Sequence, residues 1–328
     1  MTSRIVSVLG VTGLQGGAVL NMLLEDGTFV PLAITCNPDG KEATKLKQRG
    51  VQVVKGDFFD KASLVSTLRG SEGMYAVCPS HSFIERNLNV GRQMTVKNVV
   101  DAAKEVGVKF FHLEVGLFSL PSINEFSGGK YTKVLHYDHK QVVEKYLKSS
   151  GLPNASIHVG WFLENFWTCV TIHNSCAPQI DPRAIPRNPL LAKTPTGFDI
   201  PVTNYRATDV MGLTWIEHDV PAAVLALVKN YTDPSKGISG RTYPVITANL
   251  LLADVTAKTT KALGRQVTCT TGPLMGLGAM DEMYTVHTEY SGMFIATPIP
   301  NPDLVALGAK YGTVEEFLER EVKPRYGQ

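Results

Sequence analysis

The sequence has few cysteines, no long hydrophobic run and no recognisable export signal. Its five cysteines are odd in number, widely spaced and nowhere arranged as Cys-x-x-Cys. This usage predicts free thiols in a reducing compartment and excludes a disulfide framework. No apolar stretch approaches the roughly 18 residues that a membrane-spanning helix needs, and the short run after Arg4 is not a signal peptide. We expect a cytoplasmic protein, with the nucleus as a second compartment and no membrane attachment.

A strong charge of either sign is also missing. The 328 residues include 32 lysines and arginines against 30 aspartates and glutamates, which gives a net charge of +2. Proteins that bind nucleic acid directly have a strongly basic balance or patch, and the densest basic stretch, residues 41–49, is interrupted by an acid. We therefore expect no direct contact with nucleic acid. The composition leaves the oligomeric state open.

The first half of the chain alternates short apolar runs with amphipathic stretches. The apolar runs predict strands at residues 5–9, 30–34, 51–54, 74–78, 108–113 and 155–159. Helices are expected between them, and strands that alternate with helices form right-handed βαβ units in a mostly parallel sheet. The predicted fold is therefore α/β, a Rossmann-like doubly wound parallel sheet.

The alternation stops after about residue 160. Residues 176–205 are rich in proline and are expected to form a loop, and helices are expected at residues 220–228, 248–263 and 312–321. We predict an NAD(P)-binding domain over residues 1–160. Residues 161–328 are expected to form a smaller C-terminal α+β portion that completes a cleft.

A glycine-rich turn, Gly10-Val11-Thr12-Gly13-Leu14-Gln15-Gly16-Gly17, follows the first predicted strand and opens an amphipathic helix. Glycines let the backbone turn sharply and approach a pyrophosphate, and the helix N-terminus offers it unpaired N–H groups and a positive dipole end. Because the strand before and the helix after are both present, the turn predicts a dinucleotide site. The predicted phosphate-binding residues are Gly10, Thr12, Gly13, Leu14, Gln15 and Gly16. The alternative is a tight strand-to-helix turn without a ligand.

The spacing Gly-x-x-Gly-x-x-Gly, and the fuller string Gly-x-Thr-Gly-x-Gln-Gly-Gly, resemble the NmrA-like family of atypical short-chain dehydrogenase/reductases. Other segments resemble the family as well: Asn-Pro-Asp at 37–39, Gly-Val-Gln-Val-Val-Lys-Gly-Asp at 50–57, a Phe-x-Glu-Asn element within 160–166, and the helix at 313–321. The resemblance spans nearly the whole chain. It implies an NAD(P)-binding Rossmann-like domain with a small C-terminal domain. It also implies one of two functions, since some members bind NADP(H) as redox sensors without turnover and close relatives are NADPH-dependent reductases.

The end of the second strand discriminates between the two dinucleotides. An acid there accepts the ribose hydroxyls of NAD, whereas a basic residue pairs with the phosphate of NADP. The family often places Arg just before the Asn-Pro, and here that residue is Cys36. No acid stands at the tip, and the resemblance favours NADP(H) over NAD(H) as the cofactor. The predicted adenosine site consists of Cys36, Asn37, Lys41, Asp57 and Phe58, and the other role for Asp57 is to cap the next turn.

The catalytic centre departs from the usual pattern. Short-chain dehydrogenases use Tyr-x-x-x-Lys on a helix, in which the lysine binds the nicotinamide ribose and the tyrosine protonates the carbonyl. Here Lys140 stands at the lysine position, but His136 replaces the tyrosine and Tyr137 lies one residue later. Three roles for Lys140 therefore remain open. It orients the cofactor only, or it transfers the proton to the substrate itself, or it orients the cofactor while His136 or Tyr137 donates the proton. After the fifth strand, Val115 stands where a hydroxyl side chain usually helps to polarise the substrate carbonyl. The alternative to a catalytic centre is that the helix with His136, Tyr137 and Lys140 is a solvated face without a site.

An aromatic cluster follows the sixth predicted strand. It lies where cofactor clefts open in α/β sheets, at the carboxyl ends of the strands, and the alternative is packing between the two parts of the chain. The predicted substrate pocket consists of His81, Phe83, Trp161, Phe162, Asn165 and Phe166. No third ligand accompanies His136 and His139, so we expect no metal site. The glycine-rich residues 272–278 are expected to act as a lid.

Two functions remain open on the sequence. The first is an NADPH-dependent reductase of a small apolar carbonyl, enone or quinone, for which the partner is a small-molecule substrate. The second is a non-catalytic NADP(H) sensor that acts through a regulatory protein. The lysine and the aromatic cluster favour the reductase, and the missing tyrosine and hydroxyl favour the sensor.

Overall fold

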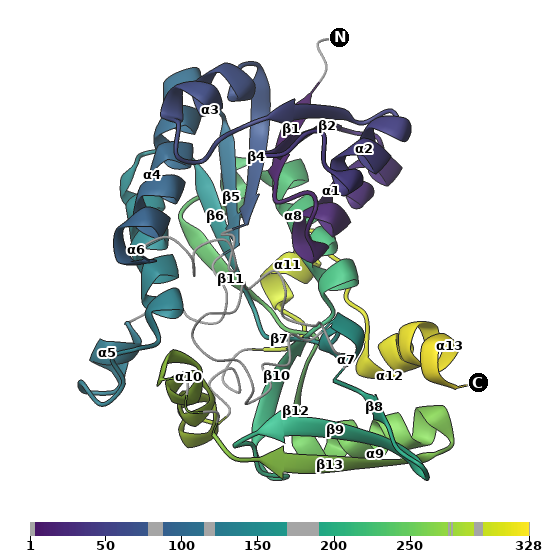
Figure 1. Cartoon of the computed structure of the whole chain (residues 1–328). Helices are drawn as coiled ribbons and strands as arrows, with labels where there is room; N and C mark the ends of the chain where they lie inside the picture. The colour runs from purple at the N-terminus through teal and green to yellow at the C-terminus, as the bar shows by residue number, and fades with distance from the viewer. Residues whose placement is uncertain are drawn as a thin grey trace.

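Seven parallel strands form the larger sheet of the molecule (Figure 1). The computed structural model describes residues 4–77, 88–114, 122–168, 190–274, 276, 278–291 and 298–327. The sheet has the order β11-β6-β5-β4-β1-β2-β3, and every neighbouring pair is parallel. Its strands are β1 (Ile5–Leu9), β2 (Val30–Thr35), β3 (Gln52–Lys55), β4 (Ser71–Val77), β5 (Phe110–Glu114), β6 (Asn154–Val159) and β11 (Arg241–Val245). The predicted Rossmann-like fold is confirmed.

The strand order reverses beside β1, which pairs with β2 on one side and β4 on the other. The chain first winds outward through β2 and β3 and then returns to continue through β4, β5 and β6. In open α/β sheets, ligands bind at such a switch point, outside the carboxyl ends of the strands. The fold therefore places the glycine loop, which follows β1, at the position where this architecture binds ligands.

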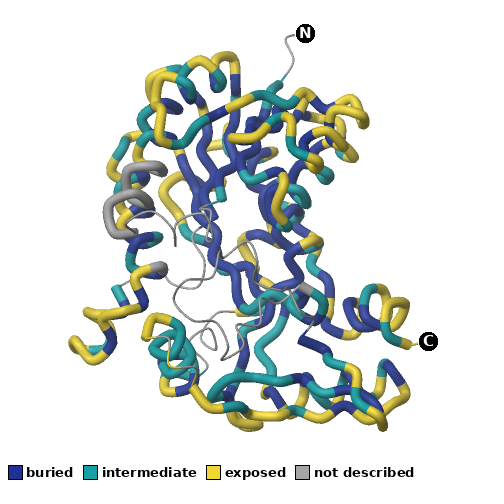
Figure 2. Tube along the Cα trace, viewed as in Figure 1, coloured by how far each residue is buried: buried dark blue, intermediate teal, exposed yellow. Residues whose placement is uncertain are grey.

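Helices cover both faces of the large sheet. One face carries α1 (Leu14–Asp26), α2 (Lys41–Gln48) and α8 (Ile216–Asn230), and the other carries α3 (Lys61–Leu68), α4 (Leu88–Val106) and α6 (Leu135–Ser149). Alternate residues of β4 divide between the two cores, since Tyr75 belongs to the first and Met74 and Ala76 to the second. Because both faces are covered, apolar residues predominate in these strands, and Figure 2 shows the buried residues concentrated along them.

Two three-stranded sheets form the rest of the molecule. One has the order β12-β10-β7 and the other the order β13-β9-β8. Their strands are β7 (Trp161–Phe162), β8 (Ala192–Lys193), β9 (Gly197–Thr203), β10 (Val210–Thr214), β12 (Ala248–Leu251) and β13 (Gln266–Gly272). The remaining elements are α5 (Ile123–Phe126), α7 (Asn165–Thr168), η2 (Pro234–Lys236), α9 (Leu252–Leu263), α10 (Gly278–Glu289), α11 (Pro302–Ala306), α12 (Val314–Phe317), η3 (Leu318–Val322) and α13 (Lys323–Tyr326).

Two sequence expectations for this part were wrong. Residues 197–203 lie in the expected loop but form β9, in which Pro201 lies beyond the short pairing with β8. That side of β9 is an edge, a position that tolerates proline. The expected helix over 248–263 is split, because residues 248–251 pair with β10 as β12 and only Leu252–Leu263 is helical.

The chain returns to the large sheet after residue 160. β11 pairs with β6, and α8 packs beside α1 in the same hydrophobic core. The division into residues 1–160 and 161–328 stays a prediction. One strand of the large sheet, β11, and one helix on its face, α8, come from the second of these two parts. Among the helices of the described ranges, none is both long and apolar enough to cross a membrane.

Candidate functional site

The glycine loop makes a tight turn from β1 into α1. Gly10 has a φ of +74°, and the N–H of Gly13 donates to the carbonyl of Gly10 at 2.9 Å. Gly13 is the N-cap of α1 and has no side chain to cap it, and the first turn of the helix contains no acid. The first N–H groups of α1 therefore remain available to an anion at the switch point.

The first turn of α1 packs against the backbone of the loop itself. A Cβ atom at Gly16 would lie 2.4 Å from the carbonyl oxygen of Gly10, so only glycine fits there. The Gln15 side chain is buried and accepts from the Tyr75 hydroxyl at 3.5 Å. Of the predicted phosphate-binding residues, Thr12 and Gly13 are exposed, whereas Gln15 and Gly16 are buried.

The end of β2 offers neutral and basic groups. Cys36 and Asn37 are exposed, and the N–H of Asn37 donates to the Thr35 hydroxyl at 3.2 Å. Lys41 is exposed at the first position of α2, a helix whose N-cap has no side-chain hydrogen bond. The nearest acid, Asp39, is paired with Lys47 at 3.2 Å. This end of the strand therefore has no carboxylate at its tip, and Lys41 and the N-terminus of α2 are suited to a phosphate.

At the end of β3, the carboxylate of Asp57 accepts from the N–H of Phe59 at 2.9 Å. Asp57 thus caps the turn, which was one of its two predicted roles. Phe58 is half-buried against the second core, and its carbonyl accepts from the Asn98 amide at 3.0 Å. The predicted contact of Asp57 and Phe58 with adenine stays a prediction.

Lys140 is held at the carboxyl end of β5. Its Nζ lies 3.4 Å from both carboxylate oxygens of Glu114, the last residue of that strand. The Glu114 side chain is 1% exposed and that of Lys140 is 17% exposed. The sequence analysis missed Glu114, although an acid at the end of an apolar strand requires a partner once it is buried. The pair places the ammonium group at the carboxyl end of the large sheet, on the strand next to β4.

The Tyr137 hydroxyl is hydrogen-bonded to α10. It lies 3.0 Å from Nε2 of His287 in α10, and the Nδ1 of that ring lies 2.6 Å from the Tyr205 hydroxyl. Burial lowers the pKa of His287 to about 4, so the imidazole is neutral at pH 7. Burial also raises the pKa of Tyr137 and of Tyr205 well above the ordinary value. Neither His287 nor Tyr205 was predicted, and no local sequence signal marks them.

Several predicted positions lie outside the described residues. These are His81, Phe83, Val115 and the side chain of His136. Among the residues that are described, no group of three or more His, Cys, Asp or Glu side chains is arranged to hold a metal ion.

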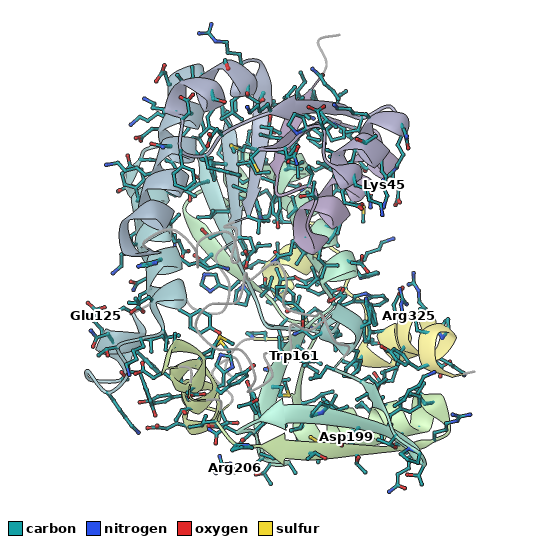
Figure 3. The ribbon with its side chains drawn as sticks, viewed as in Figure 1. Lys45, Glu125, Trp161, Asp199, Arg206 and Arg325 are labelled. Carbon is teal, nitrogen blue, oxygen red and sulfur yellow. The ribbon has the colours of Figure 1, made fainter. Side chains whose placement is uncertain are left out.

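In the aromatic cluster after β6, one side chain is fully buried and the others are partly exposed. Phe166 is buried between Trp161 and Phe317, at ring distances of 6.1 and 6.0 Å. Trp161 begins β7 of one small sheet and lies near the middle of the molecule (Figure 3). Trp161, Phe162 and Asn165 are half-buried. Phe166 serves the core, and the contact of all four residues with a substrate stays a prediction.

The acid of the Phe-x-Glu-Asn element has a structural role. Glu164 is fully buried and accepts from the N–H groups of Ile216 and Glu217 at 3.2 and 2.8 Å. It therefore caps α8, whose own N-cap residue, Trp215, makes no side-chain hydrogen bond. Burial raises the pKa of Glu164 to about 7.

Comparison with known proteins identifies the family and the fold of the chain. A model of the NmrA-like family matches residues 1–318. The NmrA-like family domain-containing oxidoreductase FrzB of Cladobotryum sp is 32% identical over 166 residues, which are 49% of this chain and 48% of that protein. The chain thus aligns with about half the length of the curated relatives that it matches.

Solved structures are similar over nearly the full chain. The negative transcriptional regulator NmrA in complex with NADP has a TM-score of 0.72 at 18% identity, covering 99% of this chain and 97% of that one. Its complex with NAD has a TM-score of 0.74 at the same identity and coverage. An NADPH-dependent quinone oxidoreductase of Escherichia coli in complex with NADPH has a TM-score of 0.64 at 21% identity, covering 96% and 99%. At these identities the likeness establishes a common fold.

Proposed function

This chain belongs to the NmrA-like family, and on that premise we propose that it binds NADP(H) and reduces a small apolar carbonyl, enone or quinone. The bound cofactor supplies a hydride. The chain's own residues bind the dinucleotide, orient its nicotinamide ribose and deliver a proton to the substrate.

The shape of the glycine loop supports dinucleotide binding. The uncapped N-terminus of α1 lies at the switch point, and the close contact of Gly16 with the Gly10 carbonyl leaves no room for a side chain at that position. A pyrophosphate fits such a cradle because it accepts several N–H hydrogen bonds at once. NmrA and the quinone oxidoreductase, which have this fold, were solved with NADP and NADPH.

The end of β2 supports NADP(H) over NAD(H). The 2′-phosphate would lie near Asn37, Lys41 and the uncapped N-terminus of α2. Since Asp39 is paired with Lys47, its charge is partly compensated. Cys36 provides no charge, so we expect a modest preference for NADPH over NADH.

The observation that carries a catalytic function is the fixed position of Lys140. An ammonium group held by a buried carboxylate at the carboxyl end of β5 suits the binding of the nicotinamide ribose. Tyr137 lies three residues earlier on α6. Of the two candidate donors, His136 and Tyr137, it is the one whose side chain the structure describes, and we assign it the donation of the proton. Relatives named as oxidoreductases support the same activity.

A second candidate function is sensing of NADP(H) without turnover. It is favoured by the structural similarity to NmrA, a negative transcriptional regulator, and by the engagement of the Tyr137 hydroxyl with His287. In that case the partner would be a regulatory protein.

Titration of NADPH and NADH into the pure protein tests the cofactor, and nicotinamide absorbance with a panel of quinones, enones and aldehydes tests the reaction. We expect tighter binding of NADPH and oxidation of NADPH by at least one member of the panel. Tight binding without oxidation would favour the sensor. If neither nucleotide binds, the proposed function is wrong.

A further inference from the structure

The sheet with the order β13-β9-β8 ends in a strand that is open on one side. Within the described part of the chain, β13 pairs only with β9, in a parallel register without interruption. A strand with one neighbour leaves every second residue with a backbone N–H and C=O that no strand bonds. Figure 1 shows β13 at the lower border of the molecule, with α9 beside it. The strand therefore offers a row of backbone groups to a ligand.

One hydrogen bond identifies the residues that face the open side. The N–H of Val267 donates to the Thr260 hydroxyl of α9 at 3.1 Å and thus points away from β9. The carbonyl of Gly272, at the other parity, accepts from the residue that follows β9 at 3.0 Å. Alternate residues of a strand direct their backbone groups to the same side. The N–H and C=O groups of Cys269 and Thr271 therefore face the open side as well.

A groove runs along this open side, between β13 and α9. Its volume is about 480 Å³, within the range of about 300–1,000 Å³ that is usual for ligand sites. On the helix side it is lined by small residues of one helix face, Ala253, Thr256, Ala257 and Thr260. On the strand side it is lined by Val267, Cys269 and Thr271. The groove thus places space for side chains next to the open backbone groups.

Both ends of the groove are bounded. At one end the Thr260 hydroxyl occupies the N–H of Val267. At the other end Ala207 lines the groove, and its carbonyl accepts from the N–H of Ala253 at 3.0 Å. From Val267 to Thr271 the strand rises by about 13 Å, so the groove fits about four residues of an extended chain. It is shorter than the seven residues that β13 of a second copy would bring.

No residue of β13 protects this edge from pairing. Proteins block exposed edge strands with charged residues, proline, bulges or a short length. Both edges of the large sheet carry such residues, since β3 ends in Lys55 and β11 contains Arg241 and Pro244. By contrast, β13 reads Gln-Val-Thr-Cys-Thr-Thr-Gly, without charge, proline or a shift in register. An edge left open in this way is suited to a partner strand.

The thiol of Cys269 is a lining group of the groove. It is half-buried, and burial together with the charge of Asp199 raises the pKa of Cys269 to about 11. The thiol is therefore protonated at pH 7 and is a poor nucleophile. The groove is suited to non-covalent binding and presents an apolar surface at this position.

The two ends of the groove differ in charge. Lys261 and Arg265 are exposed where α9 turns into β13, whereas Asp254 is exposed in the first turn of α9. Lys261 lies four residues after Ala257 and Asp254 three residues before it, so both flank the helix face that lines the groove. An acidic side chain of an incoming segment is attracted to the end at Lys261 and Arg265.

We propose that the groove between β13 and α9 binds an extended segment of a partner protein, which adds to β13 as a fourth strand of this sheet. The backbone of the segment pairs with Cys269 and Thr271, and its alternate side chains, small and apolar, enter the groove. An acidic residue of the segment lies near Lys261 and Arg265. In such strand addition, backbone hydrogen bonds give affinity and the alternate side chains give specificity. The proposal goes beyond the proposed function and holds for a reductase and for a sensor.

The first test measures amide hydrogen exchange in the full-length protein by nitrogen-15 NMR, without a partner. The amides of Thr268 and Thr270 face β9, and we expect those of Cys269 and Thr271 to exchange at least about tenfold faster. Equal protection of the four amides would mean that the edge is already covered, and it would overturn the proposal.

The second test selects binders from a phage-displayed library of random heptapeptides on the immobilised full-length protein. We expect the selected peptides to alternate small apolar residues and to include an acid. A synthetic copy of a selected peptide should slow amide exchange at Cys269 and Thr271. A library that yields no binder, or binders that leave both amides unchanged, would contradict the proposal.

Two variants locate the binding of the selected peptide, which fluorescence anisotropy measures. Ala257→Trp fills the groove from an exposed position of α9 and should weaken binding by about tenfold or more. Lys261→Glu should transfer the preference to a peptide in which lysine replaces the acid. Ala306→Trp, at an exposed position of α11, is the matched control and should bind the peptide as the wild type does. Equal binding by Ala257→Trp and the wild type would refute the inference.

Sedimentation equilibrium tests the other occupant, a second copy of the chain. We expect the oligomeric state to be the same in the wild type and in Ala257→Trp. A wild-type dimer that Ala257→Trp dissociates would show that a second copy fills the groove, and the assignment to a partner segment would be wrong. NADPH titration of the same samples keeps the two proposals apart, because loss of NADPH binding in every protein would overturn the proposed function and leave peptide binding unaffected.

Discussion

Replacing Lys140 by methionine should destabilise the protein as well as abolish turnover. The Nζ lies 3.4 Å from both oxygens of Glu114, whose side chain is 1% exposed. At that distance and an effective dielectric constant of about 20, the attraction is about 5 kcal/mol before desolvation. Removal of the lysine leaves a buried carboxylate without its cation, a change that typically costs about 3–5 kcal/mol. Because Lys140 is 17% exposed, we expect a loss near 3 kcal/mol in the free energy of unfolding.

The matched variants are Glu114→Gln and the double variant Lys140→Met/Glu114→Gln. Glu114→Gln should cost less than Lys140→Met, about 1–2 kcal/mol, because the remaining ammonium group reaches water and the amide still accepts a hydrogen bond. In the double variant no buried charge is left unpaired. We therefore expect a coupling energy of at least about 1 kcal/mol between the two positions.

Urea unfolding of the four proteins at pH 7, followed by tryptophan fluorescence, gives the coupling energy directly. NADPH affinity and turnover measured on the same samples separate the two roles of the lysine. The double variant should regain stability but not turnover. If Lys140→Met unfolds at the wild-type urea concentration, or the two substitutions are additive, then Glu114 does not hold the lysine and the reasoning is refuted.

Three further changes test other parts of the structure. Gly16→Ala, whose Cβ would lie 2.4 Å from the Gly10 carbonyl, should lower NADPH affinity by about tenfold or more, which is about 1.4 kcal/mol. A titration with NADPH measures this loss, and Gly272→Ala, the control, should bind NADPH as the wild type does. Glu164 keeps its proton in the folded state between about pH 4.5 and 7, where the unfolded chain has lost it, so its burial lowers stability as pH rises. Glu164→Gln should therefore gain about 3 kcal/mol on the wild type across that window in urea unfolding, and a constant difference would contradict this. Glu144 has the opposite sign, since its bonds to His158, Thr242 and Lys148 lower its pKa to about 2. Glu144→Gln should be costly at pH 7, and in urea unfolding at a series of pH values the cost should shrink as the pH falls from about 4.5 toward 2.

Local sequence signals predicted the first half of the fold. The strand expected at 5–9 is β1, and those expected at 30–34 and 51–54 differ from β2 and β3 by one residue. Each is a short apolar run closed by a glycine or an Asn-Pro turn, so the chain carries its own boundaries there. The later strands β9 and β13 are seven residues long, but polar residues interrupt their apolar ones, so no continuous apolar run predicts them. Ala248–Leu251 resembles the start of a helix and becomes a strand only because β10 lies beside it.

The candidate site divides in the same way. The glycine loop and Lys140 are recognisable from local spacing. Their partners are not, since Glu114 lies 26 residues before Lys140, His287 lies 150 residues after Tyr137, and Tyr205 lies 82 residues before His287. A histidine inside an amphipathic helix carries no signal of the hydrogen bonds it will make once that helix docks.

The two ends of one turn of α6 are thus tied to different parts of the chain. Lys140 is bonded to the end of β5, a strand of the large sheet, whereas Tyr137 is bonded to α10 and through it to the segment after β9. A change in the docking of α10 therefore acts on Tyr137 without touching the bond between Lys140 and Glu114. For that reason, substitutions at His287 should lower kcat while leaving the affinity for NADPH intact, and substitutions at Glu114 should alter both. If NADPH affinity and kcat fall together in His287→Gln, then the turn of α6 responds as a unit and this division of roles is wrong.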